Sequence, residues 1–196
     1  MKNYTVKKEN CDDIIVKNIY CIGRNYSEHA KELGNPKPKE PFFFQKSIPS
    51  LNTSQEIILP EDKSIDYEVE IVLLIGRSGT GKSLEDALSF IDGYAIGIDL
   101  TDREYQNSLK NKKLPWLLSK SFFGSAVVSD FSSRPIEDNF WLNLNGKRKQ
   151  QGSFEQMTFS YAEQIYFLSN KIPLMKGDLI FTGTPKGVGS LEINDK

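Results

Sequence analysis

Short apolar runs, several alternating with polar residues, recur along the chain in the pattern typical of β-strands. These runs occupy residues 14–22, 42–46, 66–75, 93–100, 140–144 and 179–181. Asn145-Gly146 follows one of them and is the dipeptide of a tight hairpin turn. The spacing of apolar residues predicts helices in 28–33, 84–91 and 158–170, and a helix or turn from 101. The pattern therefore predicts a strand-rich chain with few helices.

One predicted strand carries a row of carboxylates. Residues 66–71 read Asp-Tyr-Glu-Val-Glu-Ile and continue into the apolar run 72–75. Residues two apart in a strand point to the same side, so Asp66, Glu68 and Glu70 are predicted to share one face. Neighbouring carboxylates repel one another unless a cation lies among them, and oxygen ligands suit Mg²⁺ or Mn²⁺. The alternative is an acidic strand face in contact with water.

The segment 76–83 matches the phosphate-loop pattern GxxxxGK[ST] between a predicted strand and a predicted helix. A phosphate-loop strand is apolar on both faces, whereas this one carries alternating carboxylates. The next predicted strand follows the helix almost at once, and no strand–helix–strand alternation precedes it. We therefore favour a turn and a helix capped by Ser83 and Asp86. The apolar face expected for that helix consists of Leu84, Ala87, Leu88 and Ile91.

Composition excludes several classes of protein. The chain has 196 residues and a formal net charge of −1, which favours one domain and argues against binding to nucleic acid. No apolar run is long enough for a membrane helix, and the first residues do not lead into a signal-peptide core. Cys11 and Cys21 make no disulfide framework, so we expect a cytoplasmic protein. Residues 1–13 are expected to be a frayed terminus or a short edge strand, and residues 110–113 a solvated basic turn.

Five groups of residues occur together in a characteristic order. They are Gly23-Arg24-Asn25-Tyr26 followed by His29 and Glu32, the acidic strand 68–70, Ile98 to Arg103, Lys120-Ser121-Phe122, and the loop 182–189. This set resembles the fumarylacetoacetate hydrolase family over about residues 18–190, most closely its small acylpyruvate hydrolase branch. The resemblance places the phosphate-loop match in a connection that varies within that family.

The resemblance implies a metal centre with three carboxylate ligands. Carried over to this chain, the ligands are Glu68, Glu70 and Asp99. Asp99 thereby replaces Asp66, which becomes a neighbour of the site. The expected ion is Mg²⁺ or Mn²⁺.

The resemblance also assigns catalytic roles. His29 and Glu32 correspond to a pair on a lid helix. His29 is expected to act as general base for the attacking water, and Glu32 to orient the His29 imidazole or share the water. Lys120 is expected to stabilise a developing oxyanion. Four further residues fall at or beside substrate-contacting positions, namely Arg24, Arg103, Gln106 and Thr184. Without the resemblance, we would interpret four of these residues as surface residues, namely His29, Lys120, Arg103 and Gln106. Thr184 would be interpreted as a turn residue.

The implied activity is metal-dependent cleavage of a C–C bond in acylpyruvates such as acetylpyruvate or fumarylpyruvate, which yields pyruvate and a carboxylic acid. Oxaloacetate decarboxylation, keto–enol tautomerisation, or isomerisation of a 2-hydroxy-dienedioate are alternatives on the same fold. A nucleotide-binding protein and an inactive, metal-binding relative remain more distant alternatives. The expected partner is a small dicarboxylate or acylpyruvate, with no nucleic acid and no membrane.

The implied fold is a β-rich α+β mixed β-roll or sandwich, of the type found in the C-terminal domain of this family, with a few short helices. We expect residues 1–196 to form a single catalytic domain that assembles as a homodimer. The family usually continues beyond the loop 182–189 with further strands, whereas this chain stops at Lys196. We therefore expect those C-terminal strands to be missing.

Overall fold

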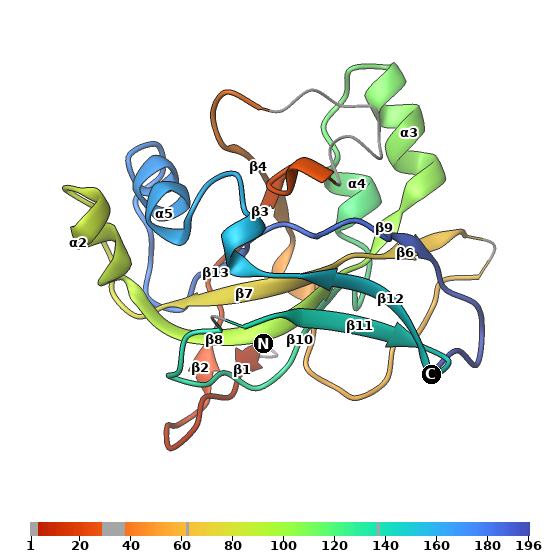
Figure 1. The fold of residues 1–196 in the computed structure, drawn as a ribbon, viewed down its shortest axis with the longest axis horizontal. Coiled ribbons are helices and arrows are strands. Elements are labelled where there is room, and N and C mark those ends of the chain that lie inside the picture. Colours follow the sequence, from red (N-terminus) through yellow and green to blue (C-terminus); the bar gives the residue numbers. More distant parts are fainter. Residues whose placement is uncertain (1–3, 29–37, 62, 137) are drawn as a thin grey trace.

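The computed structural model describes residues 4–28, 38–61, 63–136 and 138–196, and its centre is a curled, mixed seven-stranded sheet (Figure 1). Its strands in spatial order are β4 (Phe42–Lys46), β3 (Ile19–Gly23), β13 (Leu179–Phe181), β7 (Val69–Ile75), β8 (Ile91–Asp99), β10 (Ala126–Val128) and β5 (Leu51–Asn52). The pairs β13–β3 and β10–β5 are parallel, and the other pairs are antiparallel. The prediction of a β-rich α+β fold with few short helices is confirmed.

Three smaller sheets surround the central one. They pair β1 (Thr5–Val6) with β2 (Ile14–Ile15), β11 (Phe140–Leu144) with β12 (Lys147–Gly152), and β6 (Ile65–Tyr67) with both β14 (Gly189–Ser190) and β9 (Thr101–Asp102). Asn145 and Gly146 both have positive φ, as the predicted hairpin turn requires. The run 14–22 forms two strands instead of one, and part of the segment 1–13 forms the short strand β1.

The helices lie in two groups, α2 with α5 at one end of the sheet and α3 with α4 at the other (Figure 1). Their bounds are α2 Leu84–Leu88, α3 Arg103–Asn111, α4 Leu117–Lys120 and α5 Tyr161–Ser169, with short 3-10 turns at Ile48–Ser50 and Phe154–Gln156. The predicted apolar face of α2 is wrong, because Leu84 and Leu88 are 47% and 48% exposed. In this five-residue helix only Ala87 is buried. Most of the helix predicted in 28–33 lies outside the described residues.

The central strands are buried on both faces. In β7, Ile71 and Leu73 belong to the hydrophobic cluster that includes α5 and β11 residues, whereas Val72 and Leu74 belong to a second cluster on the opposite face. This explains why 71–75 is a continuous apolar run instead of an alternating one. Because both faces are filled with apolar side chains, a polar site can form only toward the ends of these strands.

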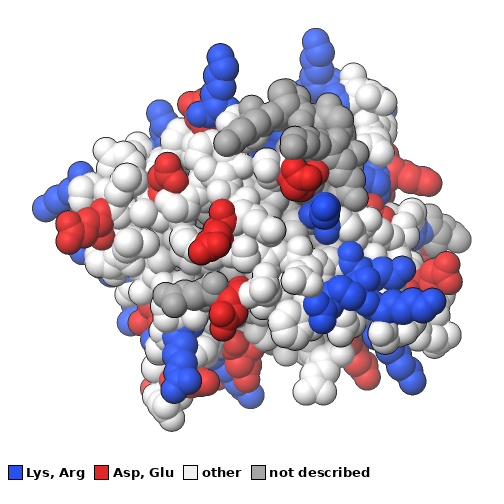
Figure 2. Space-filling model, viewed as in Figure 1, with Lys and Arg blue, Asp and Glu red and all other residues white. Residues whose placement is uncertain are grey.

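Charged side chains of both signs are interspersed over the face shown in Figure 2, with a group of basic residues at its right-hand side. Over β12, Lys147, Arg148 and Lys149 are all exposed. Within the described part of the chain, no helix is long and apolar enough to cross a membrane.

Candidate active site

Three buried carboxylates meet where β7 begins and β8 ends. Glu68 precedes β7, Glu70 lies within it, and Asp99 is the last residue of the neighbouring strand β8. The Asp99 backbone N–H donates to the Glu68 carbonyl at 2.8 Å. One ligand oxygen from each carboxylate lies within 4.8 Å of the others, and the residues are only 6%, 2% and 0% exposed. The alternative of a solvated acidic face is therefore excluded.

Asp66 lies beside this triad but not in it. Strand β6 ends at Tyr67 and β7 begins at Val69, so the expected alternation does not continue unbroken through Glu68. The Asp66 carboxylate accepts hydrogen bonds from Arg103 Nε at 2.7 Å and from Ser190 Oγ at 2.8 Å. The replacement of Asp66 by Asp99 in the predicted ligand set agrees with this geometry.

Lys120, the last residue of α4, points into the triad. Its Nζ donates to Glu68 Oε2 at 2.9 Å, to Asp99 Oδ2 at 2.6 Å and to Thr101 Oγ1 at 2.6 Å. Burial lowers the pKa of Lys120, but the charges of Asp99 and Glu68 outweigh this effect and hold the pKa above its ordinary value. Lys120 is therefore a fixed ammonium group.

Lys46, at the end of β4, is a second buried lysine that the sequence reasoning missed. Its fully buried Nζ lies 2.7 Å from Asp99 Oδ1. It also donates to the Leu100 carbonyl at 3.0 Å, to Ser125 Oγ at 3.1 Å and to the Lys120 carbonyl. Burial lowers the pKa of Lys46, although Asp99 opposes that shift. The signal that could have found it is a lysine two residues after the aromatic run 42–44, comparable to Lys120 two residues after Leu118.

The pKa of Glu70 is raised by its position in the triad. Burial raises the pKa of Glu70, and the charges of Asp99 and Glu68 raise it further, whereas a hydrogen bond from the Gly183 backbone N–H at 2.7 Å opposes the shift. Three close carboxylates in a buried site, all with oxygen donors, form a donor set that fits Mg²⁺ or Mn²⁺.

The loop after β13 is held against the triad by two buried amide side chains that the sequence reasoning also missed. The first is Gln150 of β12. Its Oε1 accepts from the Val69 backbone N–H at 2.8 Å, and its Nε2 donates to Thr184 Oγ1 and to the Pro185 carbonyl, each at 2.8 Å. Thr184 is thereby fixed beside the strand that carries Glu70.

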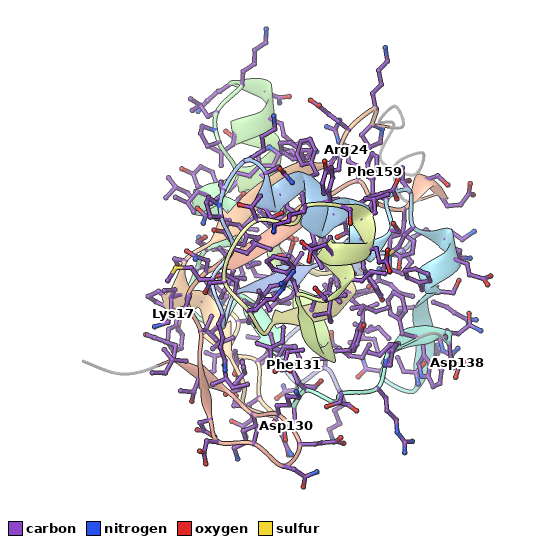
Figure 3. All side chains as sticks on the ribbon, turned by 90° about the vertical axis from the view of Figure 1, so that its left-hand side faces the viewer. Lys17, Arg24, Asp130, Phe131, Asp138 and Phe159 are labelled. Atoms are coloured by element: carbon purple, nitrogen blue, oxygen red, sulfur yellow. The ribbon has the colours of Figure 1, made fainter. Side chains whose placement is uncertain are left out.

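The second amide is Asn25, which follows β3. Its Nδ2 donates to the Thr182 carbonyl at 2.8 Å and to the Phe159 carbonyl at 3.1 Å, and its Oδ1 accepts from the Phe159 backbone N–H at 2.8 Å. Figure 3 shows the neighbouring Arg24 and Phe159 at the same end of the molecule. One side chain thus joins three segments that are far apart in the sequence.

A pocket opens above the triad and collects most of the predicted site residues. Its lining includes the three carboxylates together with Lys120, Arg24, Arg103, Gln106 and Thr184. Arg103 is held by an acidic and an amide side chain, because its Nη2 donates to Glu68 Oε1 and its Nη1 donates to Gln106 Oε1 at 2.7 Å. His29 and Glu32 lie outside the described residues.

Lys110 and Trp116 also line the pocket, and neither was predicted to do so. The interpretation of residues 110–113 as a solvated turn is therefore wrong for Lys110, which belongs to α3. The helix continues beyond the point where the sequence suggested a turn, and this extra length carries Lys110 to the pocket wall.

The phosphate-loop match at 76–83 is a turn before a capped helix, as we favoured from the sequence. Strand β7 is antiparallel to both of its neighbours, unlike the parallel strand of a phosphate loop. Ser83 Oγ accepts from the Asp86 backbone N–H at 3.1 Å, and the Asp86 carboxylate accepts from the Lys82 backbone N–H at 2.8 Å. The backbone N–H groups of Gly79 and Gly81 donate to the Leu174 carbonyl and to Ser169 Oγ, so these groups are already bonded to other parts of the protein.

Curated relatives share much of the chain. Oxaloacetate tautomerase FAHD1 of Rattus norvegicus is 40% identical over 189 residues, which cover 92% of this chain and 85% of the relative. Mitochondrial oxaloacetate decarboxylase of Dictyostelium discoideum is 39% identical over 184 residues, which cover 90% of this chain and 84% of the relative.

These relatives correct the expected localisation. The proteins from R. norvegicus and D. discoideum are both mitochondrial, so the expectation of a cytoplasmic protein is wrong. That expectation rested on cysteines without a disulfide framework, and reduced cysteines do not distinguish one reducing compartment from another.

A solved structure of similar sequence also has the same fold as this chain. Fumarylpyruvate hydrolase of Pseudomonas aeruginosa, in complex with Mn²⁺ and pyruvate, superposes with a TM-score of 0.93 at 32% identity and covers all of this chain and 89% of that one. The family model of the fumarylacetoacetate hydrolase C-terminal domain matches residues 18–196. The chain therefore belongs to the fumarylacetoacetate hydrolase family.

Proposed function

We propose that the protein is a Mg²⁺- or Mn²⁺-dependent enzyme that interconverts the keto and enol forms of oxaloacetate or of a closely similar 2-oxo dicarboxylate. The observation that carries this proposal is the buried acidic triad, with the ammonium group of Lys120 inside it, below a pocket that is lined by further basic residues. The tautomerase and decarboxylase relatives, which are 39–40% identical, support oxaloacetate as the substrate.

The reaction requires a proton to leave C3 while the oxygen at C2 gains one. A divalent ion held by Glu68, Glu70 and Asp99 would supply Lewis acidity that polarises the 2-oxo group. Lys120 keeps its proton beside the triad, so its fixed positive charge stabilises the negative charge that develops on the C2 oxygen. We assign the removal of the C3 proton to His29, with Glu32 as its partner.

Hydrolysis of acylpyruvates, which we expected from the sequence as the main activity, is the second candidate. The P. aeruginosa relative, a fumarylpyruvate hydrolase seen with Mn²⁺ and pyruvate, favours it. Hydrolysis differs from tautomerisation because water must attack a carbonyl carbon, so it needs a base that activates water. Decarboxylation of oxaloacetate is the third candidate activity, and it would use the same polarisation of the C2 carbonyl group.

The test compares three reactions of one protein preparation. Decay of enol-oxaloacetate, pyruvate release from oxaloacetate and pyruvate release from acetylpyruvate are measured with Mg²⁺, with EDTA, and with Mg²⁺ but no protein, since the metal alone catalyses slow background reactions. We expect enol decay to be the most strongly accelerated and to stop with EDTA. Glu70→Gln should abolish it, whereas the exposed Glu85→Gln should not. Enol decay no faster than in the protein-free control would contradict the proposal.

A single catalytic domain and a homodimer remain predictions. Light scattering coupled to size-exclusion chromatography measures the assembly directly. A mass of twice the 22.3 kDa chain is the expected result, and a mass equal to one chain would contradict the dimer.

A further inference from the structure

Helix α3 presents three polar side chains to the pocket. Arg103, Gln106 and Lys110 are spaced i, i+3 and i+7, so they lie on one face of the helix, and all three line the pocket. Arg103 belongs to the first turn and Lys110 to the last. Seven residues at 1.5 Å each separate them by about 10 Å along the helix axis. The face thus runs from the acidic triad to the far side of the pocket.

The two ends of this face differ in how their charge is balanced. At the triad end, three nitrogens of Arg103 are already engaged by Asp66, Glu68 and Gln106. Its guanidinium group therefore neutralises carboxylates of the protein and is not free to bind a ligand in the same way. This geometry does not favour Arg103 as a ligand for a substrate carboxylate, although Arg103 lines the pocket.

At the other end, Lys110 has no ion pair with any carboxylate of the described residues. Its Nζ lies 5.6 Å from the centroid of the Trp116 ring, and its side chain is partly buried. Burial lowers the pKa of Lys110, as do the positive charges of Arg103 and Arg24, whereas Glu68 acts in the opposite direction. Among the described residues, Lys110 therefore lines the pocket beside a second cation, Arg24, and without a carboxylate in an ion pair with it.

We propose that Lys110 binds the second carboxylate of a dicarboxylate substrate, the one remote from the triad. This assignment rests on the proposed function only in placing the 2-oxo acid end of the substrate at the triad. A partly buried ammonium group flanked by an indole and by a second cation, Arg24, is a site for a small anion. Lys110 then makes the pocket selective for dicarboxylates such as oxaloacetate over monocarboxylates that have the same 2-oxo acid end.

The test uses two ligands that differ only in that carboxylate and are not substrates of the proposed reaction. L-Malate is L-lactate with a carboxylate added to its methyl carbon. Binding of each to the Mg²⁺-loaded protein is measured by calorimetry, without any turnover. A hydrogen bond to a charged group contributes enough to change affinity by roughly tenfold or more. We expect malate to bind the wild type at least about tenfold more tightly than lactate.

Lys110→Met should remove that preference by weakening malate alone, and Lys110→Arg should restore part of it. The control is Lys112→Met, an exposed lysine of the same chain segment that does not line the pocket, which should change neither ligand. An unchanged malate preference in Lys110→Met would overturn the assignment of Lys110. Since the measurement does not depend on catalysis, a protein that discriminates malate from lactate but does not tautomerise oxaloacetate would refute the proposed function and leave this inference standing.

Discussion

The carboxylate of Glu70 is buried beside two others, and burial together with the charges of Asp99 and Glu68 raises its pKa. A carboxyl group whose folded pKa is raised stabilises the folded state fully below its unfolded pKa, and this contribution is lost as the pH rises through the folded pKa. The metal-free protein should therefore lose stability as the pH rises from the ordinary Glu value of 4.5. Urea unfolding in EDTA across this range measures the trend.

The matched variant for this pH experiment is Glu70→Gln, which cannot titrate. Its stability should depend less on pH than that of the wild type, and the difference between the two curves isolates Glu70 from other acidic groups. Identical pH dependence of the two proteins would show that Glu70 does not titrate abnormally.

Removal of a triad carboxylate should also remove metal-dependent stabilisation. A ligand present at 100 times its dissociation constant stabilises the folded state by about 2.7 kcal/mol. For a chain of this size that amounts to a rise in melting temperature of about 5–10 °C. We expect this rise with excess Mg²⁺ in the wild type and not in Glu68→Gln or Glu70→Gln. A wild type that melts equally with Mg²⁺ and with EDTA would refute the metal site.

Lys46 gives a prediction about stability. Lys46→Met removes the ammonium group that lies against Asp99 and leaves a buried carboxylate with less compensation. Breaking a buried ion pair in this way costs about 3–5 kcal/mol of unfolding free energy. The control is Lys63→Met, whose ion pair with Asp102 at 3.0 Å involves a lysine that is 42% exposed and should contribute at most about 1 kcal/mol. Equal losses in urea unfolding would contradict the structural role of Lys46.

At the scale of elements, Gly183 lies next to β13 and positions the backbone N–H that donates to Glu70 of the triad. Its φ is +95°, and a Cβ atom there would lie 2.7 Å from the Cβ of Asn25. Gly183→Ala should therefore move the backbone N–H that donates to Glu70 and should weaken Mg²⁺ binding as well as stability. The control is Gly146→Ala in the hairpin, where φ is +75° but nothing lies within 4 Å. That variant should lose some stability and keep its Mg²⁺ affinity, as measured by calorimetry.

The turn at 76–83 supplies a second prediction for an element. Because its backbone N–H groups are already bonded to other groups of the protein, neither ATP nor GTP should raise the melting temperature, and Lys82→Ala should leave enol decay unchanged. A nucleotide-dependent rise that Lys82→Ala abolishes would support the phosphate-loop interpretation instead.

Local elements were predictable from the sequence because strand alternation, the Asn145-Gly146 turn and the Ser83 cap depend on residues close together in the chain. The pattern alone also identified Glu68 and Glu70, but it selected Asp66 as the third ligand. Asp99 could be found only through the resemblance, since the pairing of β7 with β8 brings it to Glu70. Lys46 and Gln150 were missed for the same reason, because their roles depend on contacts with distant segments.

For the molecule as a whole, the strand order could not be derived from periodicity, because alternation indicates which face of a strand is buried and not which strand lies beside it. β13 lies between β3 and β7 although about 160 residues separate it from β3, since Leu179 pairs with Ile19 and with Leu74. The family resemblance predicted the overall architecture without indicating this order.

The position of β13 has a consequence for how the protein is made. A ribosome releases β3 and β7 long before residue 179 is translated, so until then each has one edge of backbone amides without its final partner. The central sheet must therefore remain incomplete until residues 179–181 have been translated. Glu70 likewise receives the hydrogen bond from the Gly183 backbone N–H only after β13 is in place, so the triad gains this donor later than it gains Asp99.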